Sequence, residues 1–164
     1  MNLAGALARR DNQPLGDYCP IERVLGLLKT RSSILIVREA FYGATRFDEF
    51  TARTALADAT CAVRLGELVG AGVLQRQAYQ EHGQRRRHEY VLTDAGAELV
   101  PAILGLLQWG NRHATPPYPP ALSHRGCGEP VAIETRCAAG HRVETDAITV
   151  TAAGPFGLDD PPLG

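Results

Sequence analysis

Apolar residues recur at helical spacing in five stretches of the chain, and this spacing predicts five helices. The stretches cover residues 21–28, 34–41, 47–50, 61–69 and 99–110. Pro20 suits the first turn of the first helix, and either Thr30 or Ser32 can cap the second. Asp58 is predicted to cap the fourth helix, whose buried stripe includes Cys61 as a small core residue.

Two alternating stretches follow the fourth helix and predict a β-hairpin. They cover residues 73–79 and 85–92, and the second begins with Arg85, Arg86 and Arg87. One alternative is an ordinary hairpin whose charged edge does no more than block aggregation. Here, however, the hairpin follows a short helix, a turn and a second helix, which is the order of a winged helix-turn-helix. The pattern therefore predicts an α+β winged helix-turn-helix fold with one further helix at each end.

Composition is that of an ordinary globular protein. The 164 residues are 45% hydrophobic and 21% charged, and the formal net charge of −1 does not by itself predict nucleic-acid binding. Arginines gather at the hairpin and near Arg46, Arg53 and Arg64, and such local clusters favour phosphate contacts. No stretch is long and apolar enough to span a membrane, and four cysteines without a secretion signal favour the cytoplasm.

Changes in composition along the chain predict five segments. Residues 1–17 lack periodicity and are expected to be a flexible arm, while residues 18–114 form the winged-helix DNA-binding domain. Residues 115–121 are rich in proline and predict a stiff linker. Residues 122–153 alternate as strands do and predict a small β-rich segment, and residues 154–164 are expected to be a disordered tail.

The fourth helix is the one that enters the major groove in a helix-turn-helix. Its outward side chains are small or apolar, so they can contact thymine methyl groups but offer few donors to base edges. Thr60 is the candidate for a polar base contact, and Arg64 on the flank could contact phosphate or form an ion pair within the domain. The outward set is Ala59, Thr60, Ala62, Val63 and Gly66.

The hairpin arginines are predicted to supply most of the affinity for DNA. Arg85, Arg86 and Arg87 alternate along a strand, so at most two of them share a face. An arginine on phosphate or in the minor groove adds binding with little sequence information. Each neutralised phosphate should steepen the log–log salt dependence by about 0.9 on duplex DNA.

Several short motifs follow one another in a specific order between Cys19 and Gly110. They are Cys19-Pro20, Ile34-Leu35-Ile36-Val37-Arg38-Glu39, Arg46-Phe47-Asp48-Glu49-Phe50, Arg64-Leu65-x-x-Leu68-x-x-x-Gly72-Val73-Leu74 and Glu89-Tyr90-x-Leu92-Thr93-x-x-Gly96. In the order of these motifs, more than half of the chain resembles the HxlR-type winged helix-turn-helix transcriptional regulators.

The resemblance implies a homodimer that binds a near-palindromic operator on double-stranded DNA and represses or activates nearby genes. Residues 21–28 and 99–110 would form the dimer interface, although the last helix could also pack within one subunit. Arg31 and Arg46 would add cations near phosphate. Ser32 stands where the family usually has a large aromatic residue. This change either leaves room for a small-molecule effector or is compensated by another side chain, and we favour the filled gap.

Cys19 matches the cysteine with which some members of this family sense oxidants or electrophiles. It precedes a helix start, where the helix dipole favours a thiolate. Asp17 and Glu22 oppose this effect and Arg23 supports it. One alternative is a structural cysteine beneath the N-terminal arm. Another is an enzyme with Cys19 as nucleophile, but no histidine is fixed near it by sequence, and we expect no enzymatic activity.

Two pairs of possible metal ligands lie in the C-terminal segment, His124 with Cys127 and Cys137 with His141. Their spacing can close a tetrahedral zinc site, which would stabilise so small a segment. Sequences that resemble this family often carry a zinc-ribbon-like tail after the winged helix, but here Gly140 stands where that motif has its second cysteine. We therefore favour a metal-free β-hairpin over a structural zinc site. A protein-interaction module is a further alternative for this segment.

Overall fold

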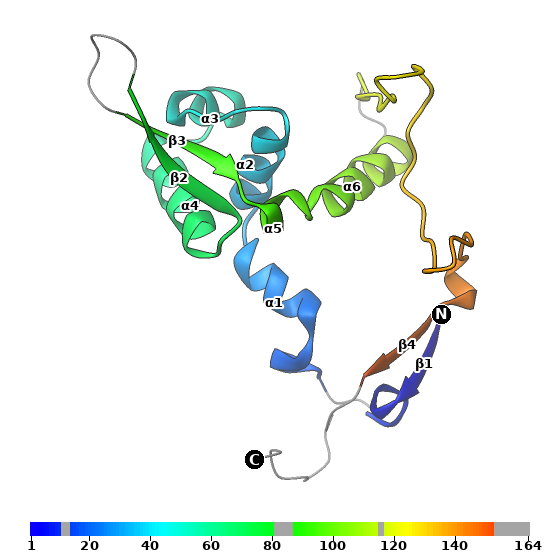
Figure 1. Ribbon diagram of the computed structural model, residues 1–164. Coiled ribbons are helices and arrows are strands. Elements are labelled where there is room, and N and C mark those ends of the chain that lie inside the picture. Colours follow the sequence, from blue (N-terminus) through cyan, green and yellow to red (C-terminus); the bar gives the residue numbers. More distant parts are fainter. Residues whose placement is uncertain (11–13, 81–86, 115–116, 153–164) are drawn as a thin grey trace.

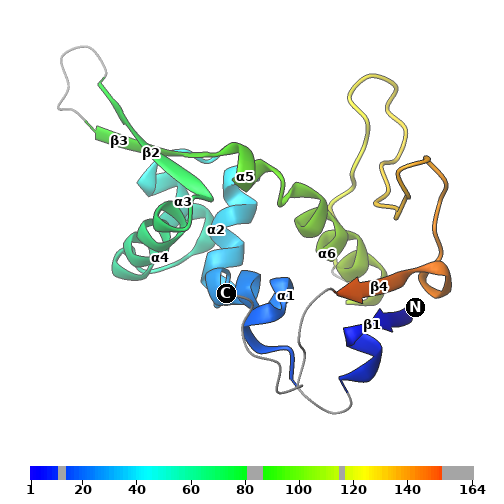
Figure 2. The ribbon, with the colours of Figure 1, turned by 60° about the horizontal axis from the view of Figure 1, so that its bottom comes forward.

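The computed structural model describes residues 1–10, 14–80, 87–114 and 117–152 (Figure 1). A helical core carries a projecting β-hairpin at one end, and a small two-stranded sheet lies at the other end (Figures 1 and 2). Helices α1 and α6 extend from the core on the side of that small sheet (Figure 1). Among the described residues, no helix is long and apolar enough to cross a membrane.

Three helices form the centre of the core: α2 (Arg31–Phe41), α3 (Phe47–Thr54) and α4 (Asp58–Gly70). Their inward side chains pack into one apolar cluster, as the helical spacing predicts. Phe50 of α3 is fully buried and meets Tyr90 edge to face, with 6.4 Å between ring centroids. The buried cluster is Ile36, Val37, Ala44, Phe50, Cys61, Leu65, Leu68, Val73, Leu74 and Ile103.

The caps of two helices were predicted, one correctly and one not. Thr30 caps α2, since its Oγ1 accepts a hydrogen bond from the Ser33 backbone N at 3.1 Å. Asp58 does not cap α4, because Ala57 occupies the extended N-cap position and Asp58 already lies within the first helical turn. The Asp58 carboxylate still favours the helix through the dipole. Ala55, at the left-handed φ of 54°, makes the turn between α3 and α4.

The predicted hairpin is present as β2 (Leu74–Tyr79) and β3 (Arg87–Leu92), paired antiparallel with Leu74 opposite Leu92. The segment before α3 meets β3 through a single isolated β-bridge between Arg46 and Glu89. The Tyr90 backbone N donates to Thr45 O at 2.7 Å beside this bridge. The winged helix-turn-helix fold predicted from the sequence is therefore confirmed.

Two flanking helices complete the helical part of the chain. Helix α1 (Pro20–Leu27) contains no buried residue. Helix α6 (Val100–His113) follows the single turn α5 (Asp94–Ala97) and buries Ile103 against the core. Both helices lie where helical spacing predicts them, but no residue of α1 is buried by the part of the chain that the structure describes.

The expected flexible arm at residues 1–17 is wrong for its first residues. Strand β1 (Asn2–Gly5) pairs in parallel with β4 (Thr149–Ala152), and the short 3-10 turn η1 (Ala6–Arg9) buries Leu7 beside them. A second 3-10 turn, η2 (Gly16–Tyr18), precedes α1. Strand β4 falls within the β-rich segment predicted for residues 122–153, whereas β1 is only four residues long and too short to show a clear alternation.

The segment after α6 is less regular than its alternation predicts. From 117 to 148 it contains two turns, closed by isolated bridges between Ser123 and Pro130 and between Arg136 and Arg142, and the 3-10 turn η3 (Thr145–Ala147). Residues 131–133 form no strand, and a side chain of α6 satisfies the Ile133 backbone instead. The predicted tail at residues 154–164 lies outside the described residues.

Candidate nucleic-acid interface

Helix α4 presents the small, apolar outer face that its buried stripe predicts. Ala59, Ala62 and Gly66 are exposed, and Val63 keeps 55% of its surface accessible. Thr60 is half-buried at the edge of this face. Such a surface can approach a major groove closely and contact thymine methyl groups, but it carries few hydrogen-bond donors. The individual DNA contacts of these residues stay predictions.

Arg64 belongs to an ion-pair group that joins α4 to the connection between α1 and α2. Its Nη1 binds Glu67 Oε2, and Lys29 Nζ lies 3.1 Å from Glu67 Oε1. Hydrogen bonds from Arg64, and then from Lys29, hold the pKa of the Glu67 carboxyl below its ordinary value. Within the described residues, Arg64 Nε is buried without a hydrogen-bond partner. The structure therefore favours the internal ion pair over a phosphate contact for Arg64.

The start of α3 is fixed by Glu49, which bonds back to the segment that precedes its own helix. Glu49 Oε2 accepts from the backbone N of Arg46 at 3.0 Å and of Thr45 at 2.8 Å. These two bonds, with the Arg46 bond the larger cause, lower the pKa of Glu49 below its ordinary value, and the charges of Arg53 and Arg46 act in the same direction. The same segment pairs with β3, so Glu49 fixes the position of α3 relative to the hairpin.

The outer part of the β2–β3 ladder, where Tyr79 pairs with Arg87, holds a basic hollow of about 410 Å³ beside the start of α3. Arg46 lies over the Tyr79 ring, with 5.0 Å from Cζ to the centroid, and Arg76 Nη2 lies 3.0 Å from His88 Nδ1. The lining residues are Arg46, Phe47, Asp48, Arg76, Tyr79, Arg87, His88 and Tyr90. This cluster of cations suits a phosphate of the DNA backbone.

Sequence reasoning missed Arg76, Tyr79 and His88 as members of this cluster. The alternation of a strand shows which of its residues share a face. It does not show which other segment lies against that face, so the sequence could not place these residues beside the start of α3. Of the predicted hairpin arginines, Arg87 is exposed at the start of β3, whereas Arg85 and Arg86 lie outside the described residues. Arg31 is exposed at the first residue of α2.

The four cysteines occupy different environments. Cys19 is half-buried at the N-cap of α1 and forms no side-chain cap. Cys61 is fully buried in the core, and this burial, with the nearby Asp58 charge as a lesser cause, raises its pKa to about 11. Cys61 is therefore a core residue held as a neutral thiol, and Cys127 and Cys137 are exposed.

The four candidate metal ligands do not converge. His124 Nδ1 lies 3.1 Å from Cys127 Sγ in the first turn of the C-terminal segment, while Cys137 and His141 belong to the second turn. The described part of the chain holds no group of three or more His, Cys, Asp or Glu side chains that could bind a metal ion. These residues therefore do not fit a tetrahedral zinc site within one chain. The single β-hairpin that we favoured is also replaced by two separate turns.

A helix-turn-helix with an exposed α4 and a basic wing defines the class of winged-helix DNA-binding proteins. Comparison with known proteins gives the family. The sequence model of the HxlR-like helix-turn-helix family matches residues 27–118, and the chain belongs to this family. Its fold and its relatives are those of DNA-binding transcriptional regulators, not of enzymes.

Three relatives illustrate the likeness. Rv3095 of Mycobacterium tuberculosis, an uncharacterized HTH-type transcriptional regulator, is 38% identical over 122 residues, which cover 71% of this chain and 76% of the relative. The crystal structure of PA1607, a candidate transcription factor, matches with a TM-score of 0.72 at 34% identity, over 83% of this chain and 96% of that one. The redox regulator HypR in its reduced form matches with a TM-score of 0.52 at 26% identity, over 61% of this chain and all of that one.

Proposed function

We propose that the protein is a homodimeric repressor that acts in the cytoplasm on a near-palindromic operator. The observation that supports a dimer most directly is α1, an eight-residue helix with no buried residue. Ile21 is 70% exposed and Leu25 58%, and on α6 Leu106 is 59% and Trp109 62% exposed. Apolar helix faces of this kind require cover, and a second copy that contributes the same two helices provides it symmetrically.

On DNA, each subunit would place the outer face of α4 in the major groove and the basic hollow at the outer part of the β2–β3 ladder against the DNA backbone. The α4 face offers shape and methyl contacts, while Arg76 and Arg87 offer charge. Two subunits related by a twofold axis would then engage two half-sites about one helical turn apart, roughly 10 base pairs between centres. Fixed spacing adds the specificity that the donor-poor α4 does not supply by itself.

Genome-wide mapping of bound DNA, followed by gel-shift titration of the recovered sequence, tests this proposal. We expect a repeated half-site in inverted orientation and an affinity that falls when five base pairs are inserted between the halves. Arg76→Ala should reduce the salt slope by about 0.9 if it neutralises one phosphate. Arg125→Ala, an exposed arginine of the C-terminal segment, is the charge-matched control. An isolated half-site bound as tightly as the full site would contradict the dimeric mode.

A thiol sensor at Cys19 is the second candidate. Its side chain is partly accessible and lies at the start of α1, which is one of the two helices of the proposed interface. The similarity to HypR, whose structure is described as that of a redox regulator, supports the idea. Oxidant or a quinone should weaken operator binding by the parent protein and leave Cys19→Ser unaffected. The control is Cys127→Ser, and an equal response of parent and Cys19→Ser would contradict the sensor.

The structure also offers a place for a small-molecule effector. An apolar hollow of about 490 Å³ lies between α2 and α6 and has Arg38 and Tyr42 at its polar side. A ligand there would lie between the helix that supports α4 and the helix proposed for the dimer. Broad ligand screening by thermal shift, with Leu35→Trp as a variant that fills the hollow, tests the idea.

A further inference from the structure

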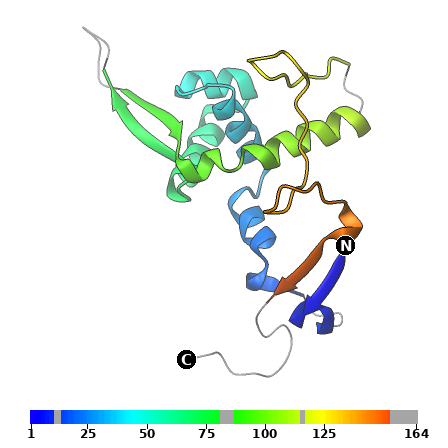
Figure 3. The ribbon, with the colours of Figure 1, turned by 45° about the vertical axis from the view of Figure 1, so that its right-hand side comes forward.

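The two ends of the described chain meet in a small unit at the opposite end of the molecule from the β2–β3 hairpin (Figures 1 and 3). We call β1, η1 and β4 the terminal unit. Leu7 is the one described residue of this unit that is buried. Two strands without a substantial core are marginal in water, and pairing residues 2–5 with 149–152 also costs the entropy of closing a long loop. The contacts within the terminal unit therefore provide little stabilisation.

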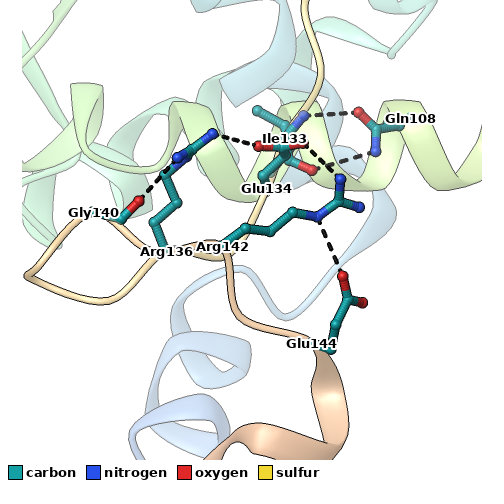
Figure 4. Close-up of polar contacts among 7 residues, drawn as sticks. All are labelled: Gln108, Ile133, Glu134, Arg136, Gly140, Arg142 and Glu144. Atoms are coloured by element: carbon teal, nitrogen blue, oxygen red, sulfur yellow. Dashed lines mark hydrogen bonds and ion pairs between the residues drawn. The ribbon is translucent and has the colours of Figure 1, made fainter.

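Polar bonds set the path of the segment that leads to β4. We call this segment, residues 117–148, the appendage. Figure 4 shows Gln108 of α6 paired with the Ile133 backbone as a neighbouring strand would be. Ile133 N donates to Gln108 Oε1 at 2.8 Å, and Gln108 Nε2 donates to Ile133 O at 3.5 Å. Asn111 Nδ2 donates to Pro120 O at 2.8 Å. The appendage is thus attached to the same helix that exposes Leu106 and Trp109.

These polar bonds direct the appendage but stabilise it little. Glu134 binds Arg136 at 2.9 Å and Arg142 at 3.3 Å, and Arg142 binds Glu144 at 3.3 Å (Figure 4). Exposed ion pairs contribute little because water and salt screen them. No residue between 117 and 152 is buried. Neither the appendage nor the terminal unit has a source of hydrophobic stabilisation comparable to that of the helical core.

The terminal unit instead exposes an apolar pair. The register places Leu3 opposite Val150, so their side chains share one face of the two-stranded sheet. Leu3 is 48% and Val150 37% exposed. In the described residues each strand also has one unpaired edge, which is a site for further pairing. Thr149 and Thr151 occupy the opposite face.

A second copy is the occupant that this face fits. Figures 1, 2 and 3 all show α1 between the core and the terminal unit, at the end of the molecule away from the hairpin. A partner that covers the exposed faces of α1 and α6 therefore continues onto the terminal unit without obstructing the DNA-binding end. The likeness to PA1607 over 83% of the chain also extends beyond residues 27–118, so it includes segments outside the family's shared domain.

We propose that the terminal unit is a second part of the dimer interface, in which Leu3 and Val150 of each subunit pack against the partner subunit. The proposal rests on the homodimer proposed above and adds a contact outside the winged-helix domain. In such a dimer the extensions at both chain ends, with Gln108 as their attachment to α6, stabilise the pairing of the two DNA-binding domains. The appendage is then a structural arm for dimerisation rather than a metal-binding module.

Sedimentation equilibrium of the full chain tests the proposal by exchanging apolar residues and threonine on the two faces of one sheet. The test variant is Leu3→Thr with Val150→Thr, and the control is Thr149→Val with Thr151→Val. Threonine favours strands as valine does, so both variants keep the propensity of β1 and β4. A symmetric dimer contains each change twice, and we expect the test variant to raise the dimer dissociation constant on the order of tenfold to a hundredfold. The control should stay within about threefold of the parent.

Trp109 is the single tryptophan of the chain and reports separately on the α6 face. Its emission should shift to the blue as the parent dimerises. A test variant that dimerises as tightly as the parent, with the same shift, would overturn the proposal and leave the homodimer intact. A parent that stays monomeric at every concentration would overturn both. Hydrogen exchange at the β1 and β4 amides checks folding, and Val150→Thr alone should still weaken the dimer by several-fold.

Discussion

The helical core buries ten apolar side chains in one cluster, whereas the terminal unit buries Leu7 and the appendage buries no described residue. In the core, each helix covers its neighbour's apolar stripe, so the stabilising contacts lie within the chain. At the two chain ends, hydrogen bonds and exposed ion pairs set the backbone path while apolar side chains stay accessible. The difference shows that a regular backbone path does not require a buried core. Under our proposal the partner subunit supplies the cover that the chain ends lack.

The largest expected effect is on the core. Phe50→Ala should lower the free energy of unfolding by about 3–5 kcal/mol, because it removes a fully buried ring and its contact with Tyr90 and leaves a cavity. Urea unfolding followed by far-UV circular dichroism measures the change. Val150→Thr in the terminal unit is the comparison and should change monomer unfolding by less than about 0.5 kcal/mol. Similar losses in the two variants would contradict the proposed difference between core and ends.

Gly96 tests how tightly the core meets the hairpin. A Cβ at Gly96 would lie 2.1 Å from Val73 O, so the backbone would have to move. Gly96→Ala should therefore destabilise the fold by about 1–3 kcal/mol. Gly105→Ala is the matched control, because a Cβ there meets nothing within 4 Å in the interior of α6, and it should stabilise by about 0.5–1 kcal/mol. Thermal melting gives the sign of the change in stability for each variant. Two melting temperatures shifted in the same direction would contradict the close contact predicted at Gly96.

Sequence reasoning succeeded where periodicity and packing agree. The stripe through Cys61, Leu65 and Leu68 fixed the faces of α4, and the hairpin alternation fixed β2 and β3. It failed where a partner distant in sequence decides the structure. Strand β1 forms because β4 lies beside it, and the backbone of Ile133 pairs with Gln108 instead of another strand.

The candidate interface divides in the same way. The exposure of Ala59, Ala62 and Val63 follows from helical geometry, so it could be predicted. The basic hollow could not, because it requires the segment before α3 to lie beside the far end of β2–β3. Asp58 illustrates a smaller failure. An aspartate near a helix start suits either the N-cap position or the first turn, and here the extended backbone of Ala57 makes Ala57 the N-cap.

A smaller effect, dependent on pH, is expected at Glu49. Its folded pKa is lowered, so its contribution to stability is fully present above its ordinary pKa and is lost as pH falls through the lower folded value. Glu49→Gln should cost about 1 kcal/mol at pH 7 through the weakened capping box. The gap between variant and parent should begin to shrink as pH falls below the ordinary glutamate pKa of about 4.3, and it should close once pH has passed through the lower folded pKa. Asp48→Asn, one residue earlier, is the control, and a gap that stays constant down to pH 3 would exclude Glu49 as the cause.

The smallest effect on global stability is expected from the bond that attaches the appendage. Gln108→Ala removes both contacts with the Ile133 backbone, yet these groups are close to water, and unfolding of the core should change by less than about 0.5 kcal/mol. Locally the effect should be large, because the Ile133 amide loses its acceptor and its hydrogen exchange should accelerate. Gln77→Ala on exposed β2 is the matched control and should leave that amide unchanged. If Gln108→Ala instead lowered core stability as much as Gly96→Ala does, the appendage would be part of the core, and the case for a second copy as its cover would lose its physical basis.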